Sequence, residues 1–317
     1  MNTPSTLGRG ERAPDFVLPL QNGTPTQFYA RAGGNPTLLI FVGKDQDTDS
    51  LNRFLEILKD EALSILTVQQ SSPPNSTSGP PVFTDQEGAV RKAYRLEDDH
   101  TTVILALNPN LRVLSTHILD NPDTAAQAIR ATVQTLPTVA PIAVTAQAPV
   151  LLISDILDSD ICHTLIQVWQ TQGHEETGVE HSIAGQRKDA IDPENKSRKD
   201  HMVTDPKLMR LLTSTVGRRV MPELQKAFHY KATRFEGFKI ACYAAEEGGF
   251  FHAHRDNLSP STAHRRFALT LNLNDAYEGG HLRFPEYGPH LYRPPAGDAV
   301  IFSSSHLHEV TPVTSGR

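Results

Sequence analysis

Two short segments near the C-terminal end of the chain have residue types and spacing suited to a metal centre. His252, His254 and Asp256 alternate in FHAHRD, so an extended strand places all three side chains on one face. His306 and His308 follow later with the same spacing of two. Two histidines and one carboxylate on one side of a metal form the facial triad of non-haem iron(II) sites, which leaves other coordination positions open. Either histidine of each pair satisfies this pattern.

The cysteine content limits the ligand chemistry of such a centre. The chain has 14 histidines but only two cysteines, Cys162 and Cys242. Neither lies in a spacing typical of a zinc site, and two cysteines cannot form a disulfide framework in a chain of this length. Any metal is therefore expected to be held by nitrogen and oxygen.

Length and composition favour a folded, two-domain protein. The chain has 317 residues, 38% of them hydrophobic and 21% charged, which is enough to bury more than one core. A net charge of −6 gives no strongly basic face, so we expect no nucleic-acid binding. No apolar run reaches the roughly 18 residues needed to span a bilayer, and residues 1–16 lack the apolar core of a signal peptide. We therefore predict a cytoplasmic protein with no membrane association.

The first part of the chain alternates apolar strands with amphipathic helices, which predicts a small α/β domain over residues 1–136 with a central sheet. A low-complexity stretch at 71–81 is expected to be a loop. The expected strands are 37–42, 64–68, 102–107 and 112–114, and the expected helices are 49–63, 87–94 and 123–136.

A proline-rich stretch at 137–149 predicts a stiff linker to a second domain over 150–317. Helices are expected at 159–169 and 206–228. The polar stretch 175–205 shows little apolar periodicity, so we expect a long loop there, either a lid over the site or a solvated connection without a role. From Phe235 onward short strands broken by glycine and proline predict a barrel or sandwich.

The N-terminal segment resembles the opening of peroxiredoxins and redoxins, which have the thioredoxin-like fold. The motifs that carry the resemblance are GERAPDF at 10–16, LP at 18–19 and NG at 22–23. That family places a reactive cysteine in a P-x-x-x-T-x-x-C loop, whereas this chain retains Thr48 but has Lys44 for the proline and Leu51 for the cysteine. Because residues 1–136 contain no cysteine, thiol chemistry is not available to them. We expect a degenerate domain kept for stability or for binding a protein partner.

The second domain resembles the prolyl 4-hydroxylase-like dioxygenases, which depend on 2-oxoglutarate and Fe(II). The resemblance covers residues 150–317 and implies a double-stranded β-helix, a jelly-roll barrel of α+β type with supporting helices. It also implies a further strand after Arg317, so this chain is expected to lack the C-terminal strand of the barrel. The motifs, in order, are Tyr243, HRD at 254–256, LND at 273–275, EGGHLRF at 278–284, PAGDAVIF at 295–302 and HEVTPVTSGR at 308–317.

The motif positions select His254, Asp256 and His308 as the iron ligands, with His252 and His306 as unused neighbours. The resemblance implies no catalytic side chain beyond this metal centre. Arg255, between two ligands, points to the opposite side of the strand and is expected to be structural.

Three further residues are implied to bind the cosubstrate. Arg317 matches the basic residue that pairs with the distal carboxylate of 2-oxoglutarate, a role that suits a planar guanidinium. Tyr243 matches a pocket tyrosine, and Asn272 stands where many relatives have another tyrosine. Alternation along 267–274 places Asn272 on the cavity face and the apolar residues of that strand against the helices.

The activity implied is hydroxylation of a C–H bond, with succinate and CO₂ as coproducts and ascorbate as an additional reductant that the resemblance allows. The substrate is a prolyl peptide, a free amino acid or another small molecule. The main alternative is a non-catalytic scaffold built from a degenerate redoxin domain and a jelly roll. A metal-dependent hydrolase that needs no 2-oxoglutarate is a further alternative, and a peroxidase is disfavoured by the missing cysteine.

Overall fold

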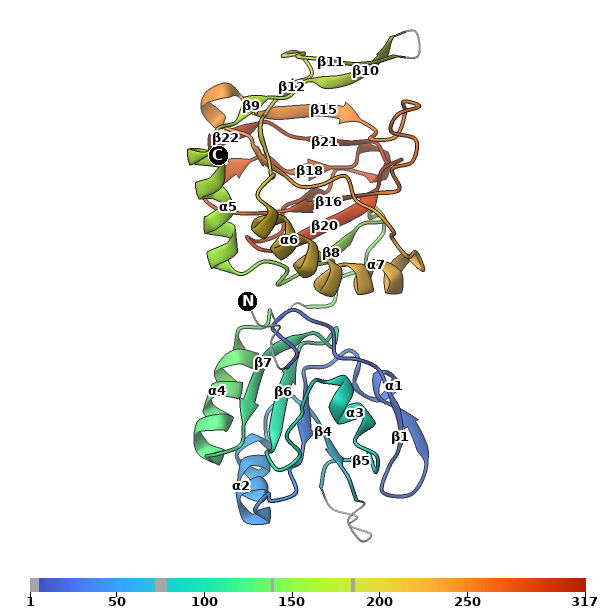
Figure 1. The fold of residues 1–317 in the computed structure, drawn as a ribbon, viewed down its shortest axis with the longest axis vertical. Coiled ribbons are helices and arrows are strands. Elements are labelled where there is room, and N and C mark those ends of the chain that lie inside the picture. The colour runs from blue at the N-terminus through green and yellow to red at the C-terminus, as the bar shows by residue number, and fades with distance from the viewer. Residues whose placement is uncertain (1–5, 72–78, 138–139, 184–185) are drawn as a thin grey trace. The chain divides into compact units, whose positions relative to one another are not determined.

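The computed structural model describes residues 6–71, 79–137, 140–183 and 186–317, with backbone alone for 179–183 and 186–190. The chain divides into two compact units, Met1–Pro141 and Ile142–Arg317 (Figure 1). The division falls inside the predicted linker, of which residues 138–139 lie outside the described part. The end of that linker packs in the second unit, because Ala148 is buried and its N–H donates to the Tyr292 hydroxyl at 3.1 Å.

The first unit is built on a five-stranded sheet in the order β5-β4-β3-β6-β7. Strands β3, β4 and β5 are parallel, and β6 and β7 form an antiparallel hairpin. With the edge strand β5 left aside, the order from β3 onward is strand, helix, strand, helix, hairpin, helix, which is that of the thioredoxin-like fold, as predicted. The strands are β1 (Val17–Pro19), β2 (Pro25–Gln27), β3 (Thr37–Phe41), β4 (Ser64–Gln69), β5 (Val82–Thr84), β6 (Val103–Leu107) and β7 (Val113–Ile118); the helices are α1 (Phe28–Ala32), α2 (Thr48–Leu58), α3 (Ala89–Ala93) and α4 (Pro122–Gln134).

Both faces of this sheet are buried, which explains why its central strands are continuous apolar runs. Leu39 and Phe41 of β3 pack with Tyr94 on one face, whereas Leu38 and Ile40 pack on the other face against α2 and α4. Figure 1 shows α2 and α4 together on one side of the sheet. The sequence pattern located the central strands and the two long helices within a few residues, but it missed β1, β2 and β5.

The residues at the start of α2 are those that the sequence comparison matched to the cysteine motif of peroxiredoxins. In this chain the N-terminus of the helix is capped by a carboxylate. Asp47 caps the helix by accepting hydrogen bonds from the Asp49 and Ser50 N–H groups at 3.3 and 3.0 Å. Hydrogen bonds from Ser50 lower the pKa of Asp47, so it remains ionised. Leu51 follows in the first turn and packs on the apolar cluster beneath α2.

We therefore expect the metal-free chain to reduce hydrogen peroxide with a thiol reductant no faster than the reductant alone. Cys162 and Cys242 belong to the second unit, and burial raises the pKa of both thiols, so neither is a ready thiolate. The measurement is peroxide consumption at neutral pH. Turnover above the blank that disappears after cysteine alkylation would contradict the expectation.

The second unit contains several antiparallel sheets, in keeping with the predicted double-stranded β-helix. A five-stranded sheet has the order β12-β15-β21-β18-β19, and two three-stranded sheets have the orders β16-β20-β8 and β14-β13-β9. The remaining pairs are β17 with β22 and β10 with β11. The strands are β8 (Leu151–Ile153), β9 (Glu175–Glu176), β10 (Val179–Ile183), β11 (Gln186–Ala190), β12 (Lys196–Ser197), β13 (Lys199–Met202), β14 (Lys239–Cys242), β15 (Phe250–His254), β16 (Phe267–Leu271), β17 (Tyr277–Gly279), β18 (Leu282–Arg283), β19 (Leu291–Tyr292), β20 (Ala299–Ser303), β21 (His308–Val310) and β22 (Val313–Gly316).

Strand β20 separates the two apolar clusters of this unit. Ala299 and Ile301 face the cluster formed with the helices, while Val300 and Phe302 face the interior cluster. Phe267, Leu269 and Leu271 of β16 pack on the helix cluster, as the alternation predicted. The helices are α5 (Ser159–Thr171), α6 (Pro206–Arg219) and α7 (Met221–Phe228). None of the helices in the described part of the chain has the length and apolar character to cross a membrane.

Two predictions for this unit are wrong. The stretch 175–205 is not a structureless loop, because it contributes β9 to β13, with residues 184–185 outside the described part. The short strands β12 and β13 pair with β15 and β14, so backbone hydrogen bonds hold them without an apolar alternation. The predicted helix 206–228 is two helices that meet at Val220, just before Pro222 in the first turn of α7.

Candidate metal centre and its pocket

Strand pairing brings the three predicted ligands together. Strands β15 and β21 are antiparallel, with His254 directly opposite His308, and Asp256 follows two residues after His254. Asp256 Oδ1 lies 3.6 Å from His254 Nε2 and 3.8 Å from His308 Nε2. One ligand atom from each residue fits within 4.8 Å of the others. Two nitrogens and one carboxylate oxygen converge on one point, which is the donor set of a facial triad.

Each histidine is oriented by a hydrogen bond to the backbone carbonyl two residues before it. His254 Nδ1 lies 2.8 Å from the carbonyl oxygen of His252, and His308 Nδ1 lies 3.0 Å from that of His306. A carbonyl only accepts, so these bonds assign the ring hydrogen to Nδ1 in both residues. The Nε2 lone pairs are then directed at the point shared with Asp256, as metal coordination requires.

The ligands lie at the inner end of the pocket among aromatic rings. The His308 side chain is only 7% exposed, and those of His254 and Asp256 are 23% and 25% exposed. Phe251 stacks on His254 with ring centroids 3.6 Å apart, and Phe302 lies 4.6 Å from His308. Burial, assisted by the neighbouring His308, lowers the pKa of His254 to about 4, so its Nε2 is unprotonated at neutral pH.

The neighbouring histidines lie outside this cluster. His252 is exposed and contacts Phe250, with ring centroids 4.6 Å apart. The His306 ring packs near Tyr287 at 5.1 Å, and its Nδ1 has no partner in the described part of the chain. The motif positions and the geometry therefore agree on the same three residues.

Arg255 has the structural position that was expected for it. Its guanidinium donates to both carboxylate oxygens of Glu286, at 2.5 and 3.1 Å, and to the carbonyl oxygen of Ser305. Glu286 in turn accepts the N–H of Leu307 at 3.0 Å. This ion pair, which we call the Arg255 clamp, joins the segment carrying His254 to the turn that leads into His308.

Replacing Arg255 by alanine should weaken metal binding by roughly tenfold, because groups that orient ligands typically contribute ten- to a hundredfold to affinity. The measurement is a competition titration with Co(II) or Fe(II) under anaerobic conditions. Arg53→Ala is a matched control, since Arg53 makes a two-point ion pair with Asp123 at 2.8 Å on the surface of the first unit. Equal metal affinity in Arg255→Ala and Arg53→Ala would show that the Arg255 clamp does not contribute to metal binding.

The pocket that holds the triad has a volume of about 1980 Å³ and is lined by all three predicted cosubstrate residues. The Tyr243 hydroxyl accepts a hydrogen bond from Arg198 Nη1 at 3.3 Å. Gly249 lets the chain pass Tyr243 closely, because a Cβ there would lie 2.8 Å from the Tyr243 Cα. Arg317 is exposed at the end of β22, and the Asn274 side chain holds its carbonyl oxygen at 2.9 Å.

Asn272 lines the pocket, but both ends of its amide are engaged by the protein. Its Nδ2 donates to the Pro294 carbonyl at 2.7 Å, and its Oδ1 accepts from the Tyr277 hydroxyl at 3.2 Å. Asn272 thus contacts Tyr277 at the pocket wall, and one N–H and one oxygen lone pair of its amide are left for a cosubstrate. Tyr277 was not singled out from the sequence, where only its place before EGGHLRF offered a signal.

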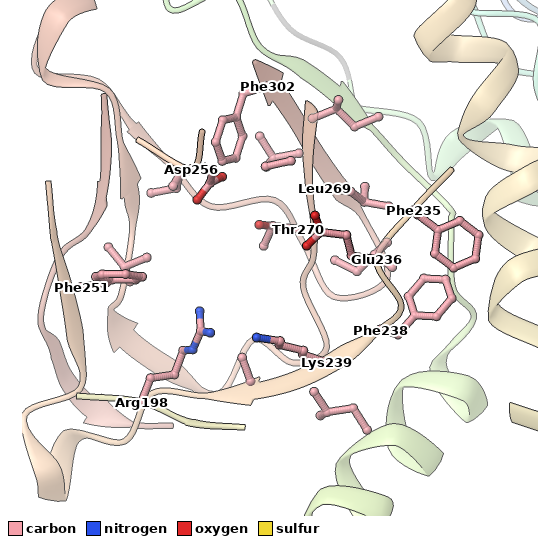
Figure 2. Close-up of a pocket in the computed structure, with 18 of the residues that line it drawn as sticks. Arg198, Phe235, Glu236, Phe238, Lys239, Phe251, Asp256, Leu269, Thr270 and Phe302 are labelled. Carbon is pink, nitrogen blue, oxygen red and sulfur yellow. The ribbon is translucent and has the colours of Figure 1, made fainter. Parts of the chain in front are cut away.

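Sequence reasoning also missed Arg198, which Figure 2 shows with its guanidinium directed into the cavity. It was seen only as one of several charges in a polar loop. Its Nη2 donates to the buried Asp200 at 2.7 Å, a pairing two residues apart that a strand places on one face.

Comparison with known proteins supports an oxygenase assignment for this region. Residues 238–317 match the 2OG-Fe(II) oxygenase superfamily, which confirms the predicted resemblance over this part of the chain. A PKHD-type hydroxylase of Stenotrophomonas maltophilia (strain R551-3) is 49% identical over 49 residues, 15% of this chain and 22% of that protein. One of Xylella fastidiosa (strain M12) is 44% identical over 61 residues, 18% and 26% of the two chains. The chain thus spans about a quarter of the length of these relatives.

Solved structures similar to this chain include thiol-dependent proteins. The peroxidoxin BcpB of Mycobacterium tuberculosis is 17% identical with a TM-score of 0.34, over 42% of this chain and 99% of that one. A thiol peroxidase of Chromobacterium violaceum is 15% identical with a TM-score of 0.35, over 41% and 90%. The assignment of the first unit to the thioredoxin-like fold rests on its own strand order.

Proposed function

We propose that the chain is an Fe(II)- and 2-oxoglutarate-dependent dioxygenase that hydroxylates a C–H bond of an organic substrate. The observation that carries the proposal is the convergence of His254, Asp256 and His308, with the Nδ1 atom of both histidines bonded to a backbone carbonyl so that Nε2 faces the shared point. The family match over 238–317 includes all three residues and supports it.

Bound Fe(II) would supply O₂ activation coupled to decarboxylation of 2-oxoglutarate to succinate and CO₂. One atom of O₂ would enter succinate, and the other would be inserted into the substrate C–H bond as a hydroxyl group. His254 and His308 would hold the ion through Nε2, and Asp256 would hold it through its carboxylate. Arg317 would pair with the distal carboxylate of 2-oxoglutarate. Phe251 and Phe302 pack against the two histidines and limit the access of water.

The test is an anaerobic titration with Fe(II) and 2-oxoglutarate, followed by measurement of succinate when O₂ is admitted. We expect one metal per chain, 2-oxoglutarate binding only with the metal present, and succinate formation that a true substrate accelerates. Metal binding with no succinate under any condition would favour the scaffold alternative. A hydrolytic product formed without 2-oxoglutarate would favour the hydrolase.

A further inference from the structure

The pocket has a second polar wall, across the cavity from the metal ligands. Figure 2 shows the side chains of Arg198 and Lys239 directed into the cavity, with Asp256 on the opposite side. Lys239 belongs to β14, and Arg198 immediately precedes β13, which pairs with β14. Alternation along the two strands places Arg198, Asp200 and Lys239 on the same face of this sheet.

The charge of this wall is positive and only partly compensated. Lysine and arginine outnumber aspartate and glutamate among the described residues that line the pocket. Asp200 pairs with Arg198, but the Arg198 Nε is buried and has no partner in the described chain. Lys239 forms no ion pair with any described carboxylate.

The acidic side chains of the pocket do not cancel this charge. Glu236 is occupied by Arg265 at 2.7 Å and by His264 at 2.7 Å. Glu175 and Glu176 are exposed on β9, which is separated from β14 by β13. Asp256 is assigned to the metal. A ligand that reaches this wall therefore meets an uncompensated lysine beside an arginine whose Nη1 and Nη2, bonded to Tyr243 and Asp200, each keep one further N–H.

We propose that Arg198 and Lys239 recognise a carboxylate on the substrate, so that the hydroxylated molecule is an amino acid or peptide with a free carboxylate, either at its C-terminus or on an acidic side chain. This inference rests on the proposed function and specifies its substrate class. A carboxylate, with two oxygens and one charge, suits one free N–H and one ammonium group, whereas a phosphate has three oxygens and up to two charges. Arg317 directly follows a different strand, β22, so the cosubstrate and the substrate have separate cationic contacts.

The position of this wall also orients the substrate. The Arg198 Cζ lies 5.9 Å from the Phe251 ring, and Phe251 stacks on the ligand His254. A carboxylate held at Arg198 and Lys239 leaves the rest of the molecule to extend across the cavity toward the triad. The cavity volume leaves room for both 2-oxoglutarate and an amino acid or short peptide.

The test uses pairs of compounds that differ only in carboxylate against carboxamide: free amino acids, dipeptides with an acid or amide end, and glutamyl against glutaminyl peptides. Binding to the metal-free chain is followed by ligand-observed NMR, and succinate formation is measured separately with Fe(II) and 2-oxoglutarate. We expect at least one acid to bind about tenfold more tightly than its amide, the effect of one charged hydrogen bond. Lys239→Met should abolish that preference, and Lys239→Glu should reverse it.

Lys207→Met, which changes an exposed lysine of α6 that does not line the pocket, is the matched control and should retain the preference. Equal binding of acids and amides, or no binding of any acid, overturns the proposal. So does a rise in the 2-oxoglutarate requirement that is larger in Lys239→Met than in Arg317→Leu, because Lys239 would then be the cosubstrate contact. The NMR measurement of binding needs no metal, so it tests the carboxylate proposal by itself. Failure of the dioxygenase proposal would be seen separately, as the absence of succinate formation.

Discussion

Asp256→Ala should reduce Fe(II)-dependent succinate formation to the background of the assay, the largest effect we expect from any single substitution. Asp256 is the only carboxylate of the triad, and imidazole is a neutral ligand, so its removal leaves the ion without a compensating charge from its ligands. His254→Ala and His308→Ala should have the same result. The measurements are succinate formation and metal content after dialysis.

His252→Ala and His306→Ala are the controls for this experiment, since each removes an imidazole two residues from a ligand. Both neighbours orient the ligands through backbone carbonyls, which alanine retains. We expect these variants to keep most of the activity and one metal per chain. Full activity in Asp256→Ala, or loss of activity only in the control variants, would show that the triad is wrongly assigned.

Arg317→Leu should raise the 2-oxoglutarate concentration needed for half-maximal succinate formation by about tenfold or more, because it removes a charged pair with the distal carboxylate. The charge of Arg317 opposes the rise in the pKa of Cys242 that burial causes. The Fe(II) requirement should change little, since Arg317 is not among the clustered ligands.

Arg210→Leu, at an exposed position of α6, is the control for loss of a positive charge. An unchanged 2-oxoglutarate requirement in Arg317→Leu would assign the distal carboxylate to another cation. The same experiment on Lys239→Met then shows whether that cation is Lys239.

The convergence of His254, Asp256 and His308 could be expected from the sequence, in part from a local rule and in part from the order of the motifs. The spacing of His254 and Asp256 follows from the alternation of a strand, and the motif order pointed to His308 as the third ligand. The central strands β3, β4 and β6 could be predicted for a similar reason, since burial on both faces makes them apolar throughout.

The features that sequence reasoning missed depend on long-range pairing. Strands β12 and β13 have two and four residues and are polar, so nothing local distinguishes them from a loop. Their pairing with β15 and β14 decides that Arg198 faces the pocket. Likewise, the hydrogen bonds of Asn272 with Pro294 and Tyr277 follow from the fold of the barrel, and the sequence around Asn272 gives no signal of them.

The backbone hydrogen bonds of His254 and His308 have a consequence for the choice of metal. Because each ring is already oriented by the carbonyl two residues before it, the two histidines need little rearrangement on binding a metal. A site of two nitrogens and one oxygen should follow the Irving–Williams order and bind Co(II), Ni(II) or Cu(II) more tightly than Fe(II). The occupancy of this centre in a cell would then be decided by which ions the cell supplies, and by how quickly a competing ion dissociates.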